Sequence, residues 1–212
     1  MKHGKFITVE GSEGVGKSTN IAYMAQQLEQ QGIDLIQSRE PGGTPLGEEV
    51  RDLLLDHRHT GMSQDAELLL MFAARAEHLS QLILPALEAG QWVLCDRFTD
   101  ASFAYQGSGR GIPADRIEVL EQWVQQGLQP DFTLLLDIDP EVGLRRAAER
   151  GGLDRFEREE IAFFHRVREG YLQRAMKFPQ RFHRVDAAQP LAEVQREIGR
   201  VVARLTGDST HG

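Results

Sequence analysis

A glycine-rich segment at 11–18 ends in a lysine followed by a hydroxyl residue. It reads Gly-Ser-Glu-Gly-Val-Gly-Lys-Ser and matches the pattern G-x-x-x-x-G-K-[S/T]. Glycines allow backbone N–H groups to converge on phosphate oxygens, and a helix that starts at the lysine adds partial positive charge. The lysine of such a loop reaches the β- and γ-phosphates of a nucleotide, and the serine ligates Mg²⁺. We therefore expect a nucleoside triphosphate to bind Gly11, Ser12, Glu13, Gly14, Val15, Gly16, Lys17, Ser18 and Thr19, with Ser18 also on the metal.

The rest of the chain restricts the class of nucleotide-binding protein that carries this loop. The only asparagine is Asn20, so the N-K-x-D motif of a GTPase is absent, and no D-x-x-G sequence occurs. A motor or AAA-type ATPase normally needs a longer chain than these 212 residues. A kinase that acts on a small molecule remains, and it requires a second anion site facing the loop. A nucleotide-dependent switch, which would have no acceptor site, is the alternative.

Charged residues follow two of the apolar runs of the sequence and are candidates for this second site. Arg39 lies just after the strand expected at the second run, 35–36, and Asp96 and Arg97 directly follow the third run, 92–95. Ligands of open α/β sheets bind beyond the carboxyl ends of the strands, so Arg39 and Arg97 are expected near an anionic substrate and Asp96 near the magnesium ion. Asp137, at the end of the fourth run, is a competing metal-binding acid that sequence position alone does not exclude. A solvated turn arginine and a structural Asp–Arg pair are the alternatives for Arg39 and for Asp96 with Arg97.

Phe72 and Arg75 are three positions apart on one face of an expected helix. Together they can stack on a base and form hydrogen bonds with its edge. Because Phe72 ends the apolar run 68–72, a plain core position is the alternative for its ring.

Short apolar runs alternate with helical patterns along the chain. The runs lie at 6–9, 35–36, 92–95, 132–136 and 182–185 and are nearly continuous, as in strands buried on both faces. Helical patterns lie between these runs. The pattern at 65–89 is interrupted before Pro85 and ends at Gly90. A further helix is expected at 190–206, after the last run. The alternation predicts an α/β fold in which helices cover both faces of a parallel sheet. No repeat or linker divides 1–212, so we expect a single domain.

Composition excludes several classes of protein. The chain has 24 Lys and Arg against 32 Asp and Glu, a net charge of −8, which argues against binding to a nucleic acid polymer or an anionic membrane. The single cysteine, Cys95, lies in an apolar run and is expected to be a buried thiol rather than a nucleophile. No apolar run has the length of about 18 residues of a transmembrane helix, and no signal peptide is visible, so a cytoplasmic location is expected.

These segments together resemble the bacterial thymidylate kinase family, in order along about residues 5 to 205. Besides the loop at 11–18, the matching segments are Arg-Glu-Pro-Gly-Gly-Thr at 39–44, Phe72 with Arg75, Asp-Arg-Phe at 96–98, Ser-Phe-Ala-Tyr-Gln-Gly at 102–107, Gly-Arg-Gly at 109–111 and Asp-Arg-Phe-Glu at 154–157. The resemblance implies a P-loop kinase fold with a five-stranded parallel sheet and a homodimer. It also implies transfer of the γ-phosphoryl group of ATP to dTMP with Mg²⁺, giving dTDP and ADP. Another nucleoside or nucleotide kinase of the same fold is the alternative.

The resemblance also implies roles for individual residues. Phe72 would stack on thymine, while Arg75 and Gln106 would bind the edge of the base. Arg39 and Arg97 would grip the dTMP phosphate with Ser102 nearby. The 3′-hydroxyl would be bound by Glu13, and Tyr105 would lie against C2′ of the deoxyribose, where a ribose hydroxyl would clash.

The catalytic cations are expected to be Lys17, Arg97 and Arg155. One class of the family carries a basic residue at the position of Gly14, which this chain lacks, and the bacterial class supplies an arginine from a lid instead. The stretch 145–158 contains five arginines around two glycines and fits a short arginine-rich lid. A mobile lid excludes water on closure and so limits wasteful hydrolysis of ATP. The alternative for this stretch is a solvated helix end with internal ion pairs.

Overall fold

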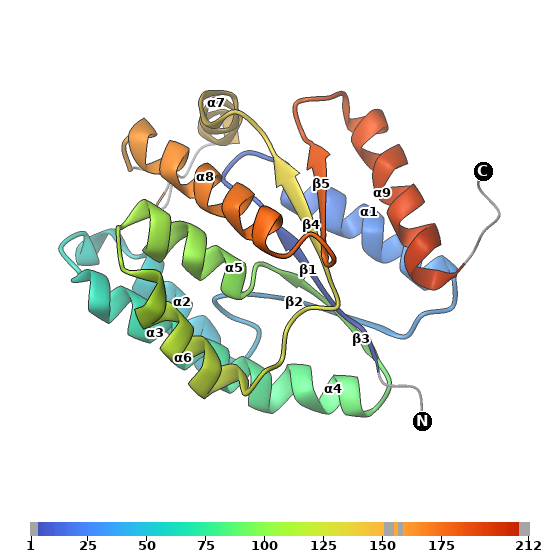
Figure 1. Cartoon of the computed structure of the whole chain (residues 1–212), viewed down its shortest axis with the longest axis horizontal. Coiled ribbons are helices and arrows are strands. Elements are labelled where there is room, and N and C mark those ends of the chain that lie inside the picture. The colour runs from blue at the N-terminus through green and yellow to red at the C-terminus, as the bar shows by residue number, and fades with distance from the viewer. Residues whose placement is uncertain (1–3, 151–154, 157–158, 208–212) are drawn as a thin grey trace.

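The computed structural model describes residues 4–150, 155–156 and 159–207. Within them, five strands form one parallel sheet in the order β2-β3-β1-β4-β5 (Figure 1). The strands are β1 (Phe6–Glu10), β2 (Leu35–Arg39), β3 (Trp92–Asp96), β4 (Phe132–Asp137) and β5 (Phe182–Asp186). The predicted five-stranded parallel sheet is confirmed, and each strand contains the apolar run from which it was expected.

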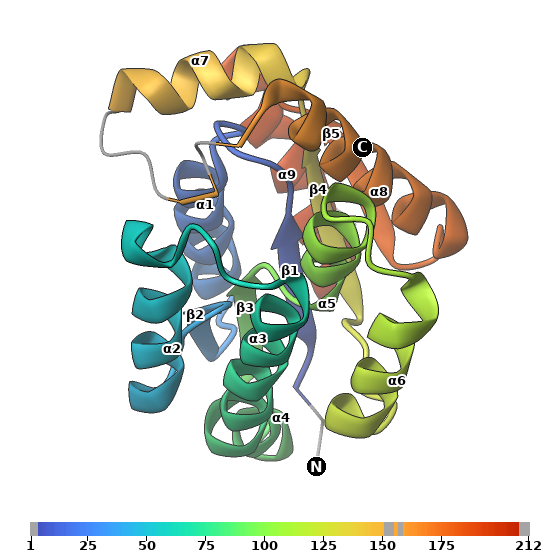
Figure 2. The same cartoon turned by 90° about the vertical axis from the view of Figure 1, so that its left-hand side faces the viewer.

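Helices cover both faces of the sheet, as the continuous apolar runs predict. Alternate residues of β1 point to opposite faces. Ile7 and Val9 pack with α1 (Lys17–Gln30) and α9 (Leu191–Thr206), whereas Phe6 packs with η2 (Leu79–Ile83) and α4 (Leu84–Glu88). The α-helices of the described residues are α1 (Lys17–Gln30), α2 (Pro45–Leu55), α3 (Gln64–His78), α4 (Leu84–Glu88), α5 (Thr99–Ser102), α6 (Ala114–Gln125), α7 (Pro140–Arg150), α8 (Ile161–Lys177) and α9 (Leu191–Thr206). A short 3₁₀ turn, η1 (His57–His59), and two π-helical stretches, η2 (Leu79–Ile83) and η3 (Phe103–Gly109), complete them. Helix α3 lies between α2 and α6 (Figure 2).

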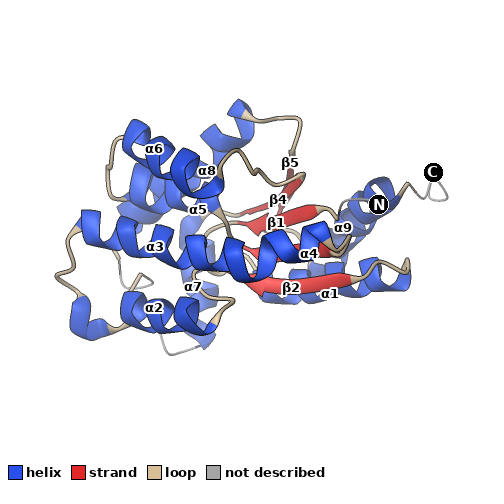
Figure 3. Cartoon of the chain, turned by 90° about the horizontal axis from the view of Figure 1, so that it is seen from below, coloured by secondary structure: helices blue, strands red, loops and turns tan. Residues whose placement is uncertain are grey.

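The long helical pattern at 65–89 forms three consecutive helical segments, α3, η2 and α4, that continue one another (Figure 3). The N–H of Leu84 donates to the carbonyl of Leu79, five residues earlier, and Pro85, which has no N–H, follows immediately. The last of these segments, α4, ends at Glu88, and Gly90 just after it has a left-handed φ of 84°. The interruption predicted before Pro85 is therefore a π-helical turn. None of the described helices is both long and apolar enough to cross a membrane.

Parallel pairing brings three loops to one edge of the sheet. Asp96 at the end of β3 is in register with Val9 of β1 on one side and with Arg39 of β2 on the other. The glycine-rich loop follows β1, and the 39–44 segment follows β2, so both begin beside Asp96. Cys95, the preceding residue, is fully buried, and burial raises the pKa of its thiol well above the ordinary value, as expected for an unreactive core cysteine.

Candidate active site

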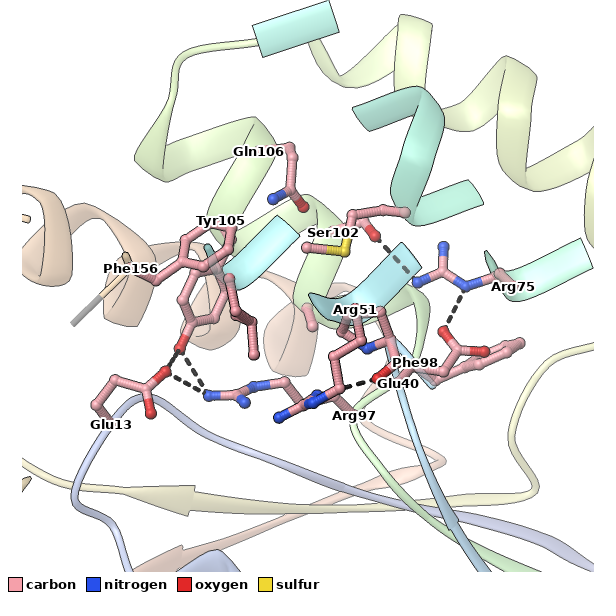
Figure 4. Close-up of a pocket in the computed structure, with 14 residues that line it drawn as sticks. Glu13, Glu40, Arg51, Arg75, Arg97, Phe98, Ser102, Tyr105, Gln106 and Phe156 are labelled. Atoms are coloured by element: carbon pink, nitrogen blue, oxygen red, sulfur yellow. Dashed lines mark hydrogen bonds and ion pairs between the residues drawn. The ribbon is translucent and has the colours of Figure 1, made fainter. Parts of the chain in front are cut away.

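A pocket lies beyond this edge of the sheet, between the glycine-rich loop and helices α2 and α3 (Figure 4). The side chains that line it come from the loops after β1, β2 and β3, from α2, α3, α5 and η3, and from Phe156. The lining residues are Glu13, Glu40, Pro41, Arg51, Leu55, Met71, Arg75, Arg97, Phe98, Ala101, Ser102, Tyr105, Gln106 and Phe156. The sequence-predicted residues Glu13, Arg75, Arg97, Ser102, Tyr105 and Gln106 are thus brought together around one cavity.

Glu13, Arg97 and Tyr105 form a closed triangle on one wall of the pocket. Arg97 Nη2 lies 2.6 Å from Glu13 Oε1 and 2.9 Å from the Tyr105 hydroxyl, which itself donates to Glu13 Oε1 at 2.8 Å. Burial alone would raise the pKa of Glu13, but Arg97 and Lys17 outweigh it and lower the pKa from 4.5 to about 2. Glu13 is therefore ionised at neutral pH, and its charge holds the Arg97 guanidinium at the pocket wall.

The glycine-rich loop is built as the pattern predicts, with Lys17 folded back over it. Lys17 Nζ donates to the carbonyls of Gly11 and Ser12, each at 3.1 Å, and burial with repulsion from Arg97 lowers its pKa. A Cβ built on Gly14 would lie 1.8 Å from the carbonyl oxygen of Gly143 in α7. No side chain fits at position 14 in this packing, so any further cation must come from another segment.

The two candidate metal acids have different surroundings. Asp137 is held by two arginines: Arg168 Nε donates to Oδ1 at 2.8 Å, and Arg184 Nη2 donates to Oδ2 at 2.6 Å. Asp96, by contrast, has a buried Oδ1 with no hydrogen-bond partner, next to the glycine-rich loop. A buried carboxylate oxygen without a donor suits a cation or its water shell. The described residues contain no cluster of three His, Cys, Asp or Glu side chains for a metal, so Mg²⁺ would depend on Asp96, Ser18 and the nucleotide phosphates.

Arg75 is fixed at the opposite end of the pocket from the glycine-rich loop (Figure 4). Its Nε donates to Glu40 Oε2 at 2.7 Å and its Nη2 to the Ser102 hydroxyl at 3.0 Å. The remaining nitrogen, Nη1, is buried and has no partner. Glu40 is in turn held by His78 Nδ1, 3.0 Å from Oε1. Arg75 therefore keeps one free donor in a polar network, which fits the recognition of an acceptor on a ligand.

The structure departs from the sequence expectation at Phe72, which is not among the lining residues. Its ring is 2% exposed, packs with Leu68 and Phe103, and is covered by the Arg75 guanidinium at 4.5 Å from its centroid. Met71, one residue earlier, lines the pocket instead. Adjacent helical residues point about 100° apart, so only one of the two can face the cavity. In this structure Met71 borders the pocket and Phe72 belongs to the core, and stacking of Phe72 on a base stays a prediction.

Arg39 also lies outside the pocket lining. Its side chain is half exposed and pairs with Glu48 at 2.8 Å. Arg51 of α2 lines the pocket in its place, with Nη1 donating to the Pro41 carbonyl at 3.0 Å. Burial and repulsion from Arg39 and Arg97 lower the pKa of Arg51, so the three arginines lie close enough to form a positive region. Arg51 was not among the residues predicted from the sequence, where it is a single arginine on the helix after the 39–44 segment.

Arg155, the predicted lid arginine, is buried beside the pocket. Its Nη2 donates to Glu67 Oε2 at 2.7 Å, its Nε donates to the Leu54 carbonyl at 2.7 Å, and its guanidinium lies over the ring of Phe156. These partners belong to α2, α3 and the pocket wall. The rest of the predicted lid motif, Asp154 and Glu157, and most of 151–158 lie outside the described residues. That Arg155 contacts the phosphates of a bound nucleotide stays a prediction.

Comparison with known proteins adds to this geometry. The family model described as "Thymidylate kinase" matches residues 9–198, most of the chain. The chain belongs to the thymidylate kinase family. A protein named thymidylate kinase from Pseudomonas entomophila is 61% identical over 195 residues, covering 92% of this chain and 93% of that one. One from Teredinibacter turnerae is 59% identical over 199 residues, covering 94% and 97%.

A solved structure shares the fold of this member of the thymidylate kinase family. The crystal structure of thymidylate kinase from Ehrlichia chaffeensis superposes with a TM-score of 0.76 and 34% sequence identity, covering 94% of this chain and 98% of that one. The similarity therefore extends over nearly the whole of both chains.

Proposed function

We propose that this chain transfers the γ-phosphoryl group of ATP to dTMP in the pocket described above, giving dTDP and ADP. As a member of the thymidylate kinase family, it is an ATP-dependent dTMP kinase. One observation supports the proposed site most directly. A single pocket contains cationic side chains next to the glycine-rich loop and, farther from it, buried hydrogen-bonding groups suited to a base.

In this proposal dTMP spans the pocket from end to end. Its phosphate is bound by Arg97 and Arg51, and Arg39 contributes long-range attraction from its exposed position. The base lies against Met71, with its edge toward Arg75 and Gln106. A carboxylate accepts hydrogen bonds, so ionised Glu13 is suited to a sugar hydroxyl, and the Tyr105 ring fills the space beside the deoxyribose.

ATP would bind the glycine-rich loop with its γ-phosphate facing the dTMP phosphate. Lys17 would leave the carbonyls of Gly11 and Ser12 and donate to the β- and γ-phosphates. A bound Mg²⁺, held by Ser18 and by Asp96 directly or through water, would neutralise charge on the transferred group. An oxygen of the dTMP phosphate attacks the γ-phosphorus, and the bond to the β,γ-bridging oxygen breaks, so the chemistry requires positioned cations rather than a strong base.

Arg155 is the proposed mobile cation of this reaction. Gly14 has no room for a side chain, and in this proposal Lys17 faces the nucleotide phosphates while Arg97 and Arg51 face the dTMP phosphate. Charge that spreads over the γ-phosphoryl oxygens in the transition state would draw Arg155 from Glu67 toward the nucleotide. The described segment 155–156 already borders the pocket through Phe156.

We also propose that the chain forms a homodimer through α2, α3 and α6. Helix α3 packs between the other two, and large apolar side chains are exposed on all three. They are Leu46, Leu53, Leu69, Val119 and Trp123, the last 74% exposed. Apolar surface of this extent is typical of a protein interface. The partners of the enzyme in this proposal are ATP and dTMP. Its net charge of −8 argues against binding to membranes or nucleic acid polymers, and we expect it in the cytoplasm.

An ADP-release assay tests the proposed function. Purified protein with Mg-ATP is given dTMP, dUMP, UMP, dCMP, AMP or no acceptor, and ADP formation is followed with a coupled enzyme system. Rapid release with dTMP and weaker release with dUMP is expected, because the thymine methyl contributes only about 1–3 kcal/mol in an apolar pocket. Faster release with any other acceptor, or release that does not depend on an acceptor, would overturn the proposal.

A further inference from the structure

Glu67 occupies a buried position behind the pocket, on the first turn of α3. Its carboxylate is 1% exposed and is surrounded by donors from two separate segments, 106–110 and 155. Oε1 accepts from Gln106 Nε2 at 3.0 Å, and Oε2 accepts from Arg155 Nη2 at 2.7 Å. Arg110 approaches both oxygens at 3.3 Å. Glu67 does not line the pocket, so any effect it has on a substrate must act through these partners.

The contact with Glu67 determines which end of the Gln106 amide is available to a ligand. An ionised carboxylate accepts hydrogen bonds and cannot donate them, so it selects the NH₂ end of the amide. Arg110 and Arg155 donate to the Glu67 carboxylate, so both of its oxygens act as acceptors toward their partners. Gln106 lines the pocket and is itself 1% exposed, so Oε1 is the end of its amide that remains for a ligand. The amide therefore presents an acceptor.

Arg75 presents the opposite kind of group to the same ligand. Its unpartnered Nη1 is a donor, because a guanidinium has no acceptor. The pocket thus combines one fixed acceptor with one fixed donor. Thymine and uracil have an N3–H donor beside the O4 acceptor, and this edge matches the pair. Cytosine has an N3 acceptor beside an N4 donor, so both of its groups would meet groups of their own kind.

We infer that Glu67 is a positioning residue that sets the preference for a keto pyrimidine by fixing the orientation of the Gln106 amide. This inference rests on the proposed function, because it requires the base of the acceptor nucleotide to lie against Gln106 and Arg75. A glutamine at position 67 can donate as well as accept. The Gln106 amide then loses its fixed orientation and can turn its NH₂ group toward N3 of cytosine.

The test compares two substrates that differ in this base edge and in little else. The kcat/KM values for dUMP and dCMP are measured for the wild type and for Glu67→Gln, together with the melting temperature of each protein. We expect the dUMP to dCMP ratio to fall about tenfold in Glu67→Gln, because the variant relieves one mismatched buried hydrogen bond for dCMP. An unchanged ratio in a folded variant would overturn the inference, even if both rates fell together.

Two further variants separate positioning from general stability. Glu159→Gln is the matched control, because Glu159 also pairs with Arg110, at 2.6 Å from Nη1, but has no bond to Gln106; its substrate ratio should stay within twofold of wild type. If Glu67→Gln does not fold, Glu67→Asp keeps the negative charge but shortens the side chain by one methylene, which lengthens its hydrogen bond to Gln106. The same fall in the ratio is then expected, and an unchanged ratio counts against the inference.

A double mutant isolates the route of the effect. In a Gln106→Leu background the amide is gone, so adding Glu67→Gln should change the dUMP to dCMP ratio by less than twofold. A further large fall would mean that Glu67 acts by some other path. A wild-type enzyme with no preference for dTMP or dUMP would instead contradict the proposed function itself, so the two failures are distinguishable.

Discussion

The assignment of Met71 rather than Phe72 to the base can be tested by a pair of substitutions on adjacent residues. Full burial of a methionine side chain is worth about 1.5–3 kcal/mol. Met71 is already partly buried by the protein, so only a fraction of its surface is left to cover a base. We take the free energy gained when a base covers this remaining surface as about 1 kcal/mol. Its loss in Met71→Ala corresponds to a roughly fivefold rise in the KM for dTMP. The melting temperature should change little, because the side chain borders a cavity.

Phe72→Leu should have the opposite signature. The ring is 2% exposed in a cluster with Leu68, Phe103, Ile112 and Ile117, so shortening it leaves a void. Truncation to alanine at such a site costs about 3–5 kcal/mol, and leucine should cost about 1–2 kcal/mol. For a chain of this size that lowers the melting temperature by roughly 2–8 °C. The KM for dTMP should stay within twofold, since Glu40 and Ser102 still hold Arg75.

Steady-state kinetics with varied dTMP and thermal melts of the same preparations measure both effects. A large rise in KM for Phe72→Leu at an unchanged melting temperature, with wild-type KM for Met71→Ala, would refute this reading of the pocket. It would mean that the helix face toward the base is the one predicted from the sequence. A rise in KM in both variants would indicate that the base reaches the ring when it binds.

Three further predictions concern charged residues. Arg155→Ala should lower kcat by about 10³-fold or more while the KM for dTMP moves little, since a cation that acts only in the transition state is lost; near-wild-type turnover would exclude Arg155 from the reaction. Arg51→Ala should raise the KM for dTMP about tenfold, as expected for a lost charged hydrogen bond, whereas Arg39→Ala should stay within threefold because Arg39 is exposed; the reverse order in titrations with dTMP would contradict the phosphate assignment. Burial raises the pKa of Glu10 from 4.5 to about 8, so the folded state holds a proton that the unfolded state has released, and the free energy of unfolding should fall from pH 5 to pH 8. Glu10→Gln should remove this part of the dependence, and parallel melting profiles for the two proteins over that range would show the reasoning to be wrong.

Much of the fold could be predicted because its signals are local. Each strand is buried on both faces, so it appears in the sequence as an apolar run, and each of the five runs became a strand. The glycine-rich loop could be predicted for the same reason. Its function depends on backbone N–H groups and on a lysine a few residues away, all within one short segment. The edge at which the substrate residues meet follows from parallel pairing alone.

The selection among neighbouring candidates could not be predicted in this way. Asp96 and Asp137 both end strands, and only the arginines that α8 and β5 bring to Asp137 distinguish them. Arg51 lines the pocket where Arg39 was expected, because Arg39 pairs with Glu48 outside the pocket whereas Arg51 reaches the Pro41 carbonyl beside it.

The sequence by itself therefore determined the fold class, the nucleotide loop and the family of this protein, since these depend on contiguous patterns. The tertiary structure decided which side of each helix faces the pocket, and so placed Met71 in the pocket lining and Phe72 in the core. It also brought Glu67 of α3 to Gln106 and Arg155, residues 39 and 88 positions away along the chain. A helix turns by about 100° per residue, and the direction of one side chain is set by packing against segments that are distant in the sequence.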